Sequence, residues 1–244
     1  MSGDWVKFPK LRSSCASLVL MGNLATCAAQ ADPLYLPTPM GTERFGRSAV
    51  NSSVLRVFGY AETESRQTFC GPTSLAIAMN SLGVSDPTPP SLFPYHLVTQ
   101  EAVFTPANLA IKSYAEVDRS GLTLDQLARF ATNLTLSASV LHAADLPAAD
   151  MRARLIAAIG QPDSRVIVNF NRASLGQEGE GHFSPLVAHD SASDSFLILD
   201  VARYKYPPAW VNSKELDISM RTVDPDSGLS RGALIVTRAA GEPR

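Results

Sequence analysis

The chain is short of cysteine and histidine. Its 244 residues include three cysteines and four histidines, and these residue types nowhere recur at the close spacing that a zinc site needs. Neither a disulfide framework nor a dedicated metal site is therefore predicted. Cys15 and Cys27 lie near the N-terminus, so Cys70 is the one cysteine in the rest of the chain.

Strong charge and long apolar runs are also lacking. The formal net charge is -2, and no basic run is interleaved with aromatic residues, which argues against a nucleic-acid partner. The most apolar stretch, residues 15–29, is too short and too interrupted by Asn23 and Thr26 for a stable membrane span. With 45% hydrophobic and 18% charged residues, the composition is that of a soluble globular protein with one large core or two small lobes.

The N-terminus has the layout of a secretory signal peptide. Three basic residues precede the apolar stretch, and the small residues of Ala29-Gln-Ala31 resemble a cleavage site. We expect residues 1–31 to be the signal peptide and residues 32–244 the folded domain, which makes the protein periplasmic or exported. Two alternatives stay open: a lipid anchor on Cys27, and a cytoplasmic protein with a poorly ordered leader.

Cys70 is the first candidate for chemistry. It is followed by Gly71 and Pro72, and then by apolar residues at helical spacing: Leu75, Ala78, Met79 and Leu82. Amides at a helix start, together with a nearby imidazolium, can lower a thiol pKa from roughly 8.5 to roughly 3.5–7.5, which would activate the nucleophile. The alternative is a small buried cysteine that only begins a helix. A lone thiol in an exported protein is a liability unless buried or used, which favours a use.

The remaining pattern predicts helices first and a sheet afterwards, an α+β architecture. Prolines between Asp32 and Gly46 favour an extended arm without a regular element, followed by a short helix within residues 50–58. Thr123 and Gln126 form a capping box for a helix over residues 124–132. Another helix is expected from Pro147 to Ile159, and strands are expected at residues 134–140, 166–170, 183–188, 195–201 and 233–237.

The histidines are the candidates for the base that takes the thiol proton. His182 follows the flexible Gly179-Glu-Gly181 and enters a strand, whereas His189 points to the opposite face and, beside a turn, is expected to be solvent-exposed. The turn residues 190–194 fold the two flanking strands into a hairpin, which brings Asp200 opposite His182 to within two or three residues. A carboxylate there fixes the imidazole tautomer and stabilises the imidazolium. The alternatives are a turn-facing or ion-paired Asp200 and a structural His182.

Three stretches around these residues resemble the phytochelatin synthases. Gly181-His-Phe-Ser-Pro185 and residues 197–210 are similar to the catalytic region of that family, and Phe69-Cys-Gly-Pro-Thr73 is similar to its nucleophile loop. The resemblance extends over about Leu34 to Arg238. It implies a papain-like fold, in which a helical lobe carrying the nucleophile packs on an antiparallel sheet carrying the histidine and the aspartate.

The resemblance also implies a glutathione γ-glutamylcysteinyltransferase. Such enzymes release glycine from glutathione through a γ-Glu-Cys acyl-enzyme, which passes to a second glutathione, forming phytochelatin, or to water. Carried onto this sequence, Cys70 is the nucleophile, His182 the general base and acid, and Asp200 the orienting carboxylate.

Substrate-binding residues follow from the same resemblance. An aspartate and an arginine seven residues apart hold the γ-glutamyl end in the family, and Asp224 and Arg231 fit that spacing; the alternative is a loop ion pair. Arg203 and Lys205 are expected near Asp200, where they would steady the site or meet a substrate carboxylate.

One position departs from the family pattern. Papain-like sites usually have a glutamine six residues before the nucleophile to help form the oxyanion hole, and that position is Glu64 here. An ionised carboxylate would repel the developing oxyanion, and removing one such donor costs roughly 10²–10³ in rate. Two ways of completing the hole stay open: a protonated Glu64, or Gln67 together with the Cys70 amide.

The expected partners are glutathione, as donor and acceptor, and no nucleic acid; a homodimer stays open. The resemblance implies no obligatory cofactor, with Cd²⁺ or Zn²⁺ arriving as glutathione thiolate complexes during metal detoxification. Because short bacterial members of the family lean towards glutathione hydrolysis, the same balance is expected here. Two other functions stay open: a papain-like peptidase acting on other peptides, and a catalytically weak protein that binds a thiol metabolite.

Overall fold

An antiparallel sheet forms the centre of the protein. The computed structural model describes residues 33–48 and 52–238, and the predicted signal peptide lies outside this part of the chain. The strands are β1 (Leu34–Tyr35), β2 (Leu136–His142), β3 (Ser164–Asn171), β4 (Gly181–Asp190), β5 (Ser195–Ile198), β6 (Ala209–Asn212) and β7 (Gly232–Arg238). They are ordered β1-β6-β5-β4-β3-β7-β2, and every neighbouring pair is antiparallel.

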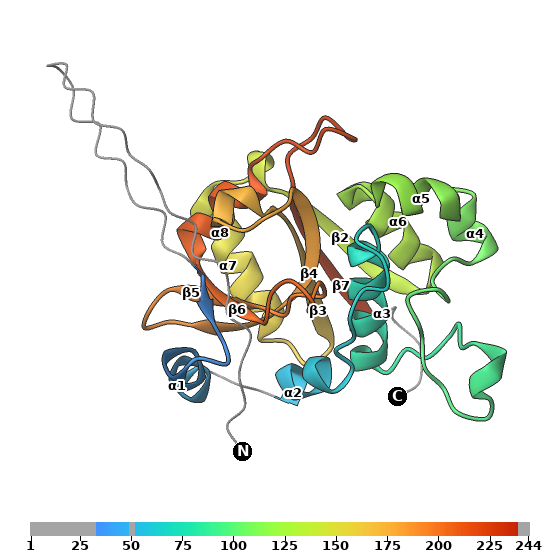
Figure 1. Ribbon diagram of the computed structural model, residues 1–244, viewed down its shortest axis with the longest axis horizontal. Coiled ribbons are helices and arrows are strands. Elements are labelled where there is room, and N and C mark those ends of the chain that lie inside the picture. The colour runs from blue at the N-terminus through green and yellow to red at the C-terminus, as the bar shows by residue number, and fades with distance from the viewer. Residues whose placement is uncertain (1–32, 49–51, 239–244) are drawn as a thin grey trace, which may run out of the picture.

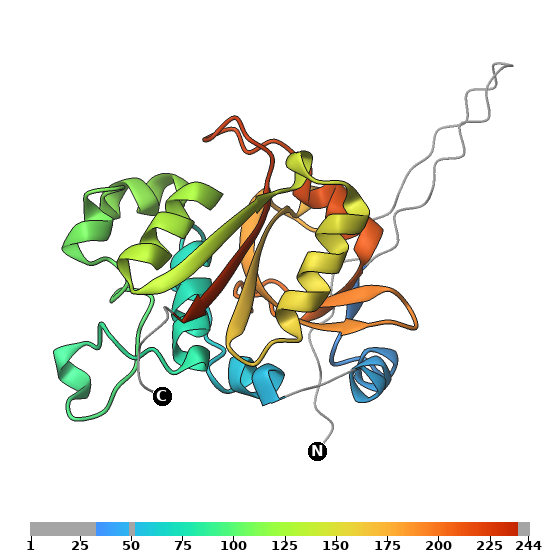
Figure 2. The same cartoon turned by 180° about the vertical axis from the view of Figure 1, so that it is seen from behind.

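Helices cover both faces of this sheet (Figures 1 and 2). They are α1 (Pro39–Arg47), α2 (Ser52–Gly59), α3 (Cys70–Leu82), α4 (Pro106–Leu109), α5 (Tyr114–Ser120), α6 (Leu124–Asn133), α7 (Ala148–Ile159) and α8 (Ser213–Met220). Alternate residues of β3 belong to two apolar clusters: Ile167 joins the one around α3 and α6, while Val166 and Val168 join the one with α7 and α8. The central strands are therefore buried on both faces. No helix among the described residues is long and apolar enough to cross a membrane.

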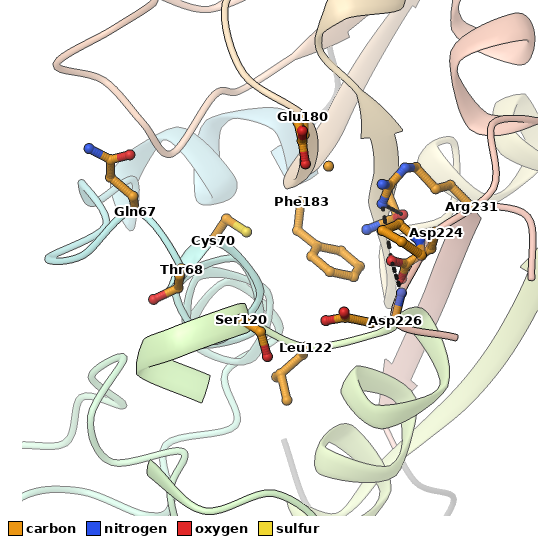
Figure 3. Close-up of a pocket in the computed structure, with 14 residues that line it drawn as sticks. Gln67, Thr68, Cys70, Ser120, Leu122, Glu180, Phe183, Asp224, Asp226 and Arg231 are labelled. Atoms are coloured by element: carbon orange, nitrogen blue, oxygen red, sulfur yellow. Dashed lines mark hydrogen bonds and ion pairs between the residues drawn. The ribbon is translucent and has the colours of Figure 1, made fainter. Parts of the chain in front are cut away.

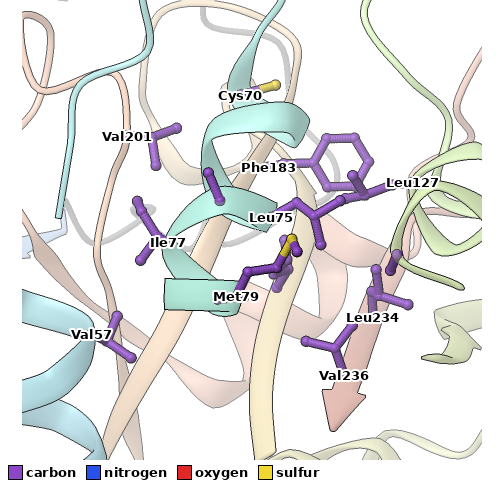
Figure 4. Close-up of a cluster of buried hydrophobic side chains, with 14 of the residues drawn as sticks. Val57, Cys70, Leu75, Ile77, Met79, Leu127, Phe183, Val201, Leu234 and Val236 are labelled. Atoms are coloured by element: carbon purple, nitrogen blue, oxygen red, sulfur yellow. The ribbon is translucent and has the colours of Figure 1, made fainter. Parts of the chain in front are cut away.

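Helix α3 is the fixed support of the nucleophile. All 13 of its residues are buried, so the helix is enclosed on every side and not on one apolar face as its spacing indicated. Figure 4 shows Cys70 at its first turn, above Leu75 and Met79, with Phe183 of β4 and Leu234 of β7 alongside. Because both the helix and its neighbours are close-packed, the thiol is held in a rigid frame.

The predicted α+β architecture is confirmed. The capping box forms as expected, with the Thr123 hydroxyl accepting from the Gln126 amide, and α6 and α7 follow the predicted ranges closely. The strand expected at residues 134–140 begins two residues later, because the helix continues to Asn133 and Thr135 adopts a left-handed conformation with φ 64°.

The prediction of an extended arm over residues 32–46 is wrong beyond its first residues. Pro39 is the first residue of α1, where its missing amide donor costs nothing. The Thr38 hydroxyl accepts a hydrogen bond from the Gly41 amide and caps the helix. Strand β6 and helix α8 were not predicted either; β6 has only four residues, and no start signal was recognised for α8.

Gly232 is required where β7 passes β2. A Cβ atom built at this position would lie 1.9 Å from the Leu141 carbonyl oxygen, a main-chain atom of the paired strand. We expect Gly232→Ala to lower the free energy of unfolding by about 1–3 kcal/mol, because the strands must separate to admit the methyl group.

Urea-induced unfolding measures this change, and Gly46→Ala is the matched control. Gly46 is exposed in α1 with nothing within 4 Å of a built Cβ, so its replacement should stabilise the helix by about 0.5–1 kcal/mol. Equal effects of the two substitutions would contradict the close approach of β2 and β7.

Candidate active site

The β4–β5 hairpin brings a histidine and a carboxylate together. Asp190 pairs with Ser195 across the turn, and a bulge between Leu186 and Ala188 shifts the register by one residue. At the far end, the His182 Nε2 atom lies 3.0 Å from an Asp200 carboxylate oxygen. The edge of the His182 ring also meets Phe170 on β3, with ring centroids 5.6 Å apart. The predicted meeting of His182 and Asp200 is therefore present in the fold.

Asp200 is held by more than the histidine. Arg172 donates two hydrogen bonds of 2.8 Å, one to each carboxylate oxygen, and the Ala202 amide donates another of 2.8 Å. Burial alone would raise the pKa of Asp200, but the hydrogen bonds and positive charges of His182 and Arg172 outweigh it and hold the pKa well below its usual range. Asp200 is thus an ionised, fully bonded carboxylate that faces the imidazole.

Arg172 is the site residue that sequence reasoning missed. It is 3% exposed, it follows β3 directly, and its guanidinium also donates to the Gln177 side chain at 2.8 Å and lies over the Tyr206 ring at 5.1 Å. The signal that would have found it is the pairing of β3 with β4, in which Asn171 lies opposite Gly181. That register places the residue after β3 beside His182, but only the β4–β5 hairpin was assigned from the sequence.

The thiol of Cys70 completes the group. Its sulfur, a ring nitrogen of His182 and a carboxylate oxygen of Glu64 all lie within 4.8 Å of one another. Because His182 Nε2 is engaged by Asp200, Nδ1 is the nitrogen that remains for the sulfur. Helix α3, the hairpin and the loop before α3 therefore meet at one point, as the sequence predicted for Cys70 and His182.

The predicted low pKa of the Cys70 thiol is wrong. Burial raises the pKa of Cys70 to about 12, with a further rise from the Glu64 carboxylate, and the amides of Phe183 and Gly71 offset only part of it. Burial likewise lowers the pKa of His182 below its ordinary value, against the opposing effect of Asp200. Both shifts favour the uncharged forms, a thiol beside an imidazole, and a nucleophilic Cys70 would then need His182 as a general base.

Glu64 occupies the position expected for an oxyanion-hole residue. Its amide donates to the Val201 carbonyl at 2.9 Å, which fixes the loop beside Asp200. The side chain is 4% exposed; Oε1 accepts from the Tyr204 hydroxyl at 2.5 Å, whereas Oε2 is buried without a partner. Burial raises the pKa of Glu64 to about 7 although the Tyr204 bond opposes it. A protonated Glu64 can therefore donate from Oε2 near neutral pH.

Gln67 is less suited to that role. It is exposed, and Figure 3 shows its amide group turned away from the Cys70 sulfur. Its place at the rim of the pocket keeps it near the site, but no hydrogen bond of its side chain to the catalytic group is present among the described residues.

A pocket of about 260 Å³ opens beside the sulfur (Figure 3). Cys70, Asp224 and Arg231 are among its lining residues, so the structure brings the predicted substrate pair to the nucleophile. The Arg231 guanidinium is 3.9 Å from Asp224 and donates to Asn169 at 3.3 Å. Gly181 makes room for it, because a Cβ there would lie 2.3 Å from a guanidinium nitrogen.

The structure does not bring Arg203 to this pocket. Arg203 is exposed and donates to the Ala61 carbonyl at 3.3 Å, while Lys205 lies close enough for its charge to lower the pKa values of Glu64 and His182. The expectation that His189 is solvent-exposed is wrong. Its side chain is 9% exposed, donates a 3.0 Å hydrogen bond from Nε2 to the Asp194 carboxylate, and packs on the Phe196 ring.

These features define a class of protein. A buried thiol at the start of a central helix, an imidazole from a β-hairpin and a carboxylate behind it form a papain-like cysteine-nucleophile site on an α+β fold. The chain belongs to the phytochelatin synthase family, whose model matches residues 31–233.

Several curated proteins that are similar to the chain are named glutathione gamma-glutamylcysteinyltransferases. It is 30% identical over 188 residues to glutathione gamma-glutamylcysteinyltransferase 3 of Lotus japonicus, and 31% identical over 187 residues to glutathione gamma-glutamylcysteinyltransferase 1 of Triticum aestivum. The similarity to the glutathione gamma-glutamylcysteinyltransferase of Schizosaccharomyces pombe is 28% over 206 residues. These matches cover 77%, 77% and 83% of this chain but 38%, 36% and 48% of the relatives, so the chain spans less than half of their length.

Replacing Arg172 by methionine should destabilise the fold strongly. The change leaves the buried Asp200 carboxylate without its bidentate partner, and breaking a buried ion pair in this way costs about 3–5 kcal/mol. Urea-induced unfolding gives the loss. Arg203→Met is the matched control, because it removes the same charge from an exposed side chain and should change stability by about 0.5 kcal/mol or less. Similar losses in both variants would contradict the role given to Arg172.

Replacing Glu64 by glutamine should change how the catalytic rate depends on pH. As the pH rises through about 7, Glu64 ionises; the carboxylate then raises the Cys70 pKa and repels the oxyanion, so wild-type kcat falls. Since the protonated fraction drops tenfold per pH unit, the ratio of Glu64→Gln to wild-type kcat should grow by up to roughly tenfold for each unit above 7.

A steady-state rate assay of the wild type and of Glu64→Gln between pH 5.5 and 9 measures this ratio. The control is Glu62→Gln, because burial also raises the pKa of Glu62 to about 7 but that residue is outside the group around Cys70. Glu62→Gln should follow the wild-type profile. Parallel wild-type and Glu64→Gln profiles would show that Glu64 does not complete the oxyanion hole.

Proposed function

We propose that this protein transfers the γ-glutamylcysteinyl group of glutathione, releasing glycine. The observation that carries the proposal is that Cys70, which lies beside His182 and Asp200, lines a pocket that also presents Arg231 and Asp224. Family membership and the names of the relatives support the same reaction.

The first half-reaction forms an acyl-enzyme. His182 Nδ1 takes the thiol proton while the Cys70 sulfur attacks the carbonyl carbon of the Cys–Gly amide of glutathione. The Cys70 amide and a protonated Glu64 would donate to the negative oxygen of the tetrahedral intermediate. His182 then returns its proton to the amide nitrogen, the C–N bond breaks, and glycine leaves with γ-Glu-Cys bound to sulfur as a thioester.

The second half-reaction transfers that acyl group. His182, neutral again, takes a proton from the α-amino group of a second glutathione or from water, and the resulting nucleophile attacks the thioester carbonyl. The sulfur leaves as thiolate and regains the proton from His182. An amine acceptor gives a phytochelatin chain, and water gives free γ-Glu-Cys. Throughout, Asp200 remains ionised and stabilises the imidazolium that forms in each step.

The γ-glutamyl end of the donor has a suitable place in the pocket. The Arg231 side chain is 6% exposed, and its Nε atom is buried without a hydrogen-bond partner. A buried guanidinium with a free donor can grip an α-carboxylate, and the Asp224 carboxylate beside it can hold the α-ammonium. The loop between Asp224 and Arg231 is itself closed by hydrogen bonds between Asp224 and Leu229 and between Arg231 and Thr222, which keeps both side chains at the pocket.

Further features of this proposal concern partners and location. Divalent Cd²⁺ or Zn²⁺ would enter as part of glutathione thiolate complexes, as cargo of the substrate, with no cofactor required. A homodimer and export by the N-terminal leader remain proposals from the sequence. The leader lies outside the described residues.

Mass analysis of the products from glutathione tests the function, with and without Cd²⁺ or Zn²⁺. Wild-type protein should release glycine and yield γ-Glu-Cys by hydrolysis, together with longer (γ-Glu-Cys)n-Gly chains by transfer. Cys70→Ser and His182→Ala should reduce glycine release by at least about 10³-fold, because each removes half of the nucleophilic pair.

Two outcomes would overturn the proposal. Untouched glutathione alongside cleavage of peptides without a γ-glutamyl end would indicate a peptidase. Glutathione binding without turnover, at an unreactive Cys70, would indicate a protein that binds a thiol metabolite.

A further inference from the structure

The three groups around the sulfur are also a set of metal ligands. Cys70 offers a thiolate, His182 an imidazole nitrogen and Glu64 a carboxylate oxygen, and these atoms lie within 4.8 Å of one another. Around a tetrahedral zinc ion such atoms lie about 3.3–3.6 Å apart, given zinc–ligand bonds of about 2.0–2.3 Å. A side-chain adjustment of about 1 Å therefore brings all three to bonding distance.

The carboxylate supplies an independent sign of a missing ligand. Glu64 is 4% exposed, and its Oε2 atom is buried without a partner, although buried oxygens normally have one. The other oxygen is already oriented by the Tyr204 hydroxyl. Oε2 is thus the free coordination position of an otherwise fixed carboxylate.

The surroundings resemble those that support a zinc ligand. A metal-binding histidine usually donates its second ring N–H to a carboxylate, which fixes the tautomer. His182 Nε2 does this to Asp200 at 3.0 Å, and Asp200 is in turn fixed by Arg172. The nitrogen left for a metal is Nδ1, on the side of the sulfur.

Charge also balances at such a site. Asp200 and Arg172 neutralise each other, the ligands add the negative charges of the Glu64 carboxylate and the Cys70 thiolate, and the charge of Lys205 also acts on Glu64 and His182. On binding, Cys70 releases its proton to solvent while His182 binds as neutral imidazole, and the two anionic ligands offset the 2+ charge. Sulfur, nitrogen and oxygen ligands together favour Zn²⁺ or Cd²⁺ over Mg²⁺ or Ca²⁺.

We propose that Glu64, Cys70 and His182 bind a free zinc-like divalent cation and that this binding blocks the nucleophile. The pocket beside Cys70 gives the ion a path to the sulfur, and a fourth coordination position is left for water or a thiolate. Glu64 thereby makes this chain sensitive to free metal ions, as distinct from metal ions carried by glutathione.

The metal binding is argued from geometry alone, whereas the inhibition of activity rests on the proposed function.

Cobalt binding to the full chain, without glutathione, tests the site. Co²⁺ substitutes for Zn²⁺, and a tetrahedral Co²⁺–thiolate centre gives visible and near-ultraviolet absorption bands; competition with Zn²⁺ then gives the zinc affinity. The wild type should show the bands. Cys70→Ser should lose the thiolate band, and this difference excludes any contribution from Cys15 and Cys27. Glu64→Gln should bind at least tenfold more weakly, because outer-shell losses alone cost about 10–100-fold.

Glu62→Gln is the matched control for Glu64→Gln. It removes a carboxyl group with the same raised pKa and one unpartnered buried oxygen, two residues away and outside the cluster. Its cobalt spectrum and zinc affinity should equal those of the wild type, and circular dichroism confirms that each variant is folded.

Two results would overturn the metal site: a thiolate band that survives in Cys70→Ser, or a Glu64→Gln affinity equal to the wild-type value. Because no glutathione is present, neither result depends on transferase activity. In the activity assay, free Zn²⁺ should inhibit the wild type at a concentration at least tenfold lower than it inhibits Glu64→Gln. Inhibition of both proteins at equal zinc concentrations would show that metal binding at this site does not block the nucleophile.

Discussion

The carboxylate of Asp200 is the contact on which the site depends. It receives hydrogen bonds from the end of β3 through Arg172, from the start of β4 through His182, and from the main chain of its own loop at Ala202. One buried anion thus joins three segments of the sheet and sets the direction of the imidazole. Without it, His182 would be a buried ring with no fixed tautomer, and the thiol of Cys70 would have no oriented base.

Burial gives the site its resting state. The same packing that encloses α3 raises the pKa of Cys70 and lowers that of His182, which favours the uncharged form of both groups. Six buried side-chain polar atoms of the described residues have no hydrogen-bond partner, and two of them, Glu64 Oε2 and Arg231 Nε, belong to the region around Cys70 and its pocket. Such unpartnered atoms are costly in a stable fold. Their position indicates ligands that come from solution: an oxyanion or a metal ion for the first, and a substrate carboxylate for the second.

Local patterns predicted much of this arrangement, because they depend on neighbouring residues alone. The turn at residues 190–194 was enough to place Asp200 near His182, and a capping box was enough to place α6. Arg172 could not be found in this way, because its role follows from the pairing of β3 with β4. No turn motif between these two strands was recognised in the sequence. The thiol pKa was mispredicted for a related reason: a helix start suggests a low value, whereas the burial that outweighs it is a property of the whole fold. The extended arm was predicted wrongly at Pro39, because proline occurs both in extended segments and at the first position of a helix.

The central claim is that the Cys70 sulfur carries the γ-Glu-Cys group after His182 has removed its proton. Rapid mixing of the protein with glutathione, quenching in acid within the first turnover, and mass spectrometry of the peptide that contains Cys70 measure this directly. The account predicts one γ-Glu-Cys thioester on that peptide in the wild type and none in His182→Ala. Release of glycine by the wild type with Cys70 unmodified at every quench time, or with the acyl group on another residue, would contradict it.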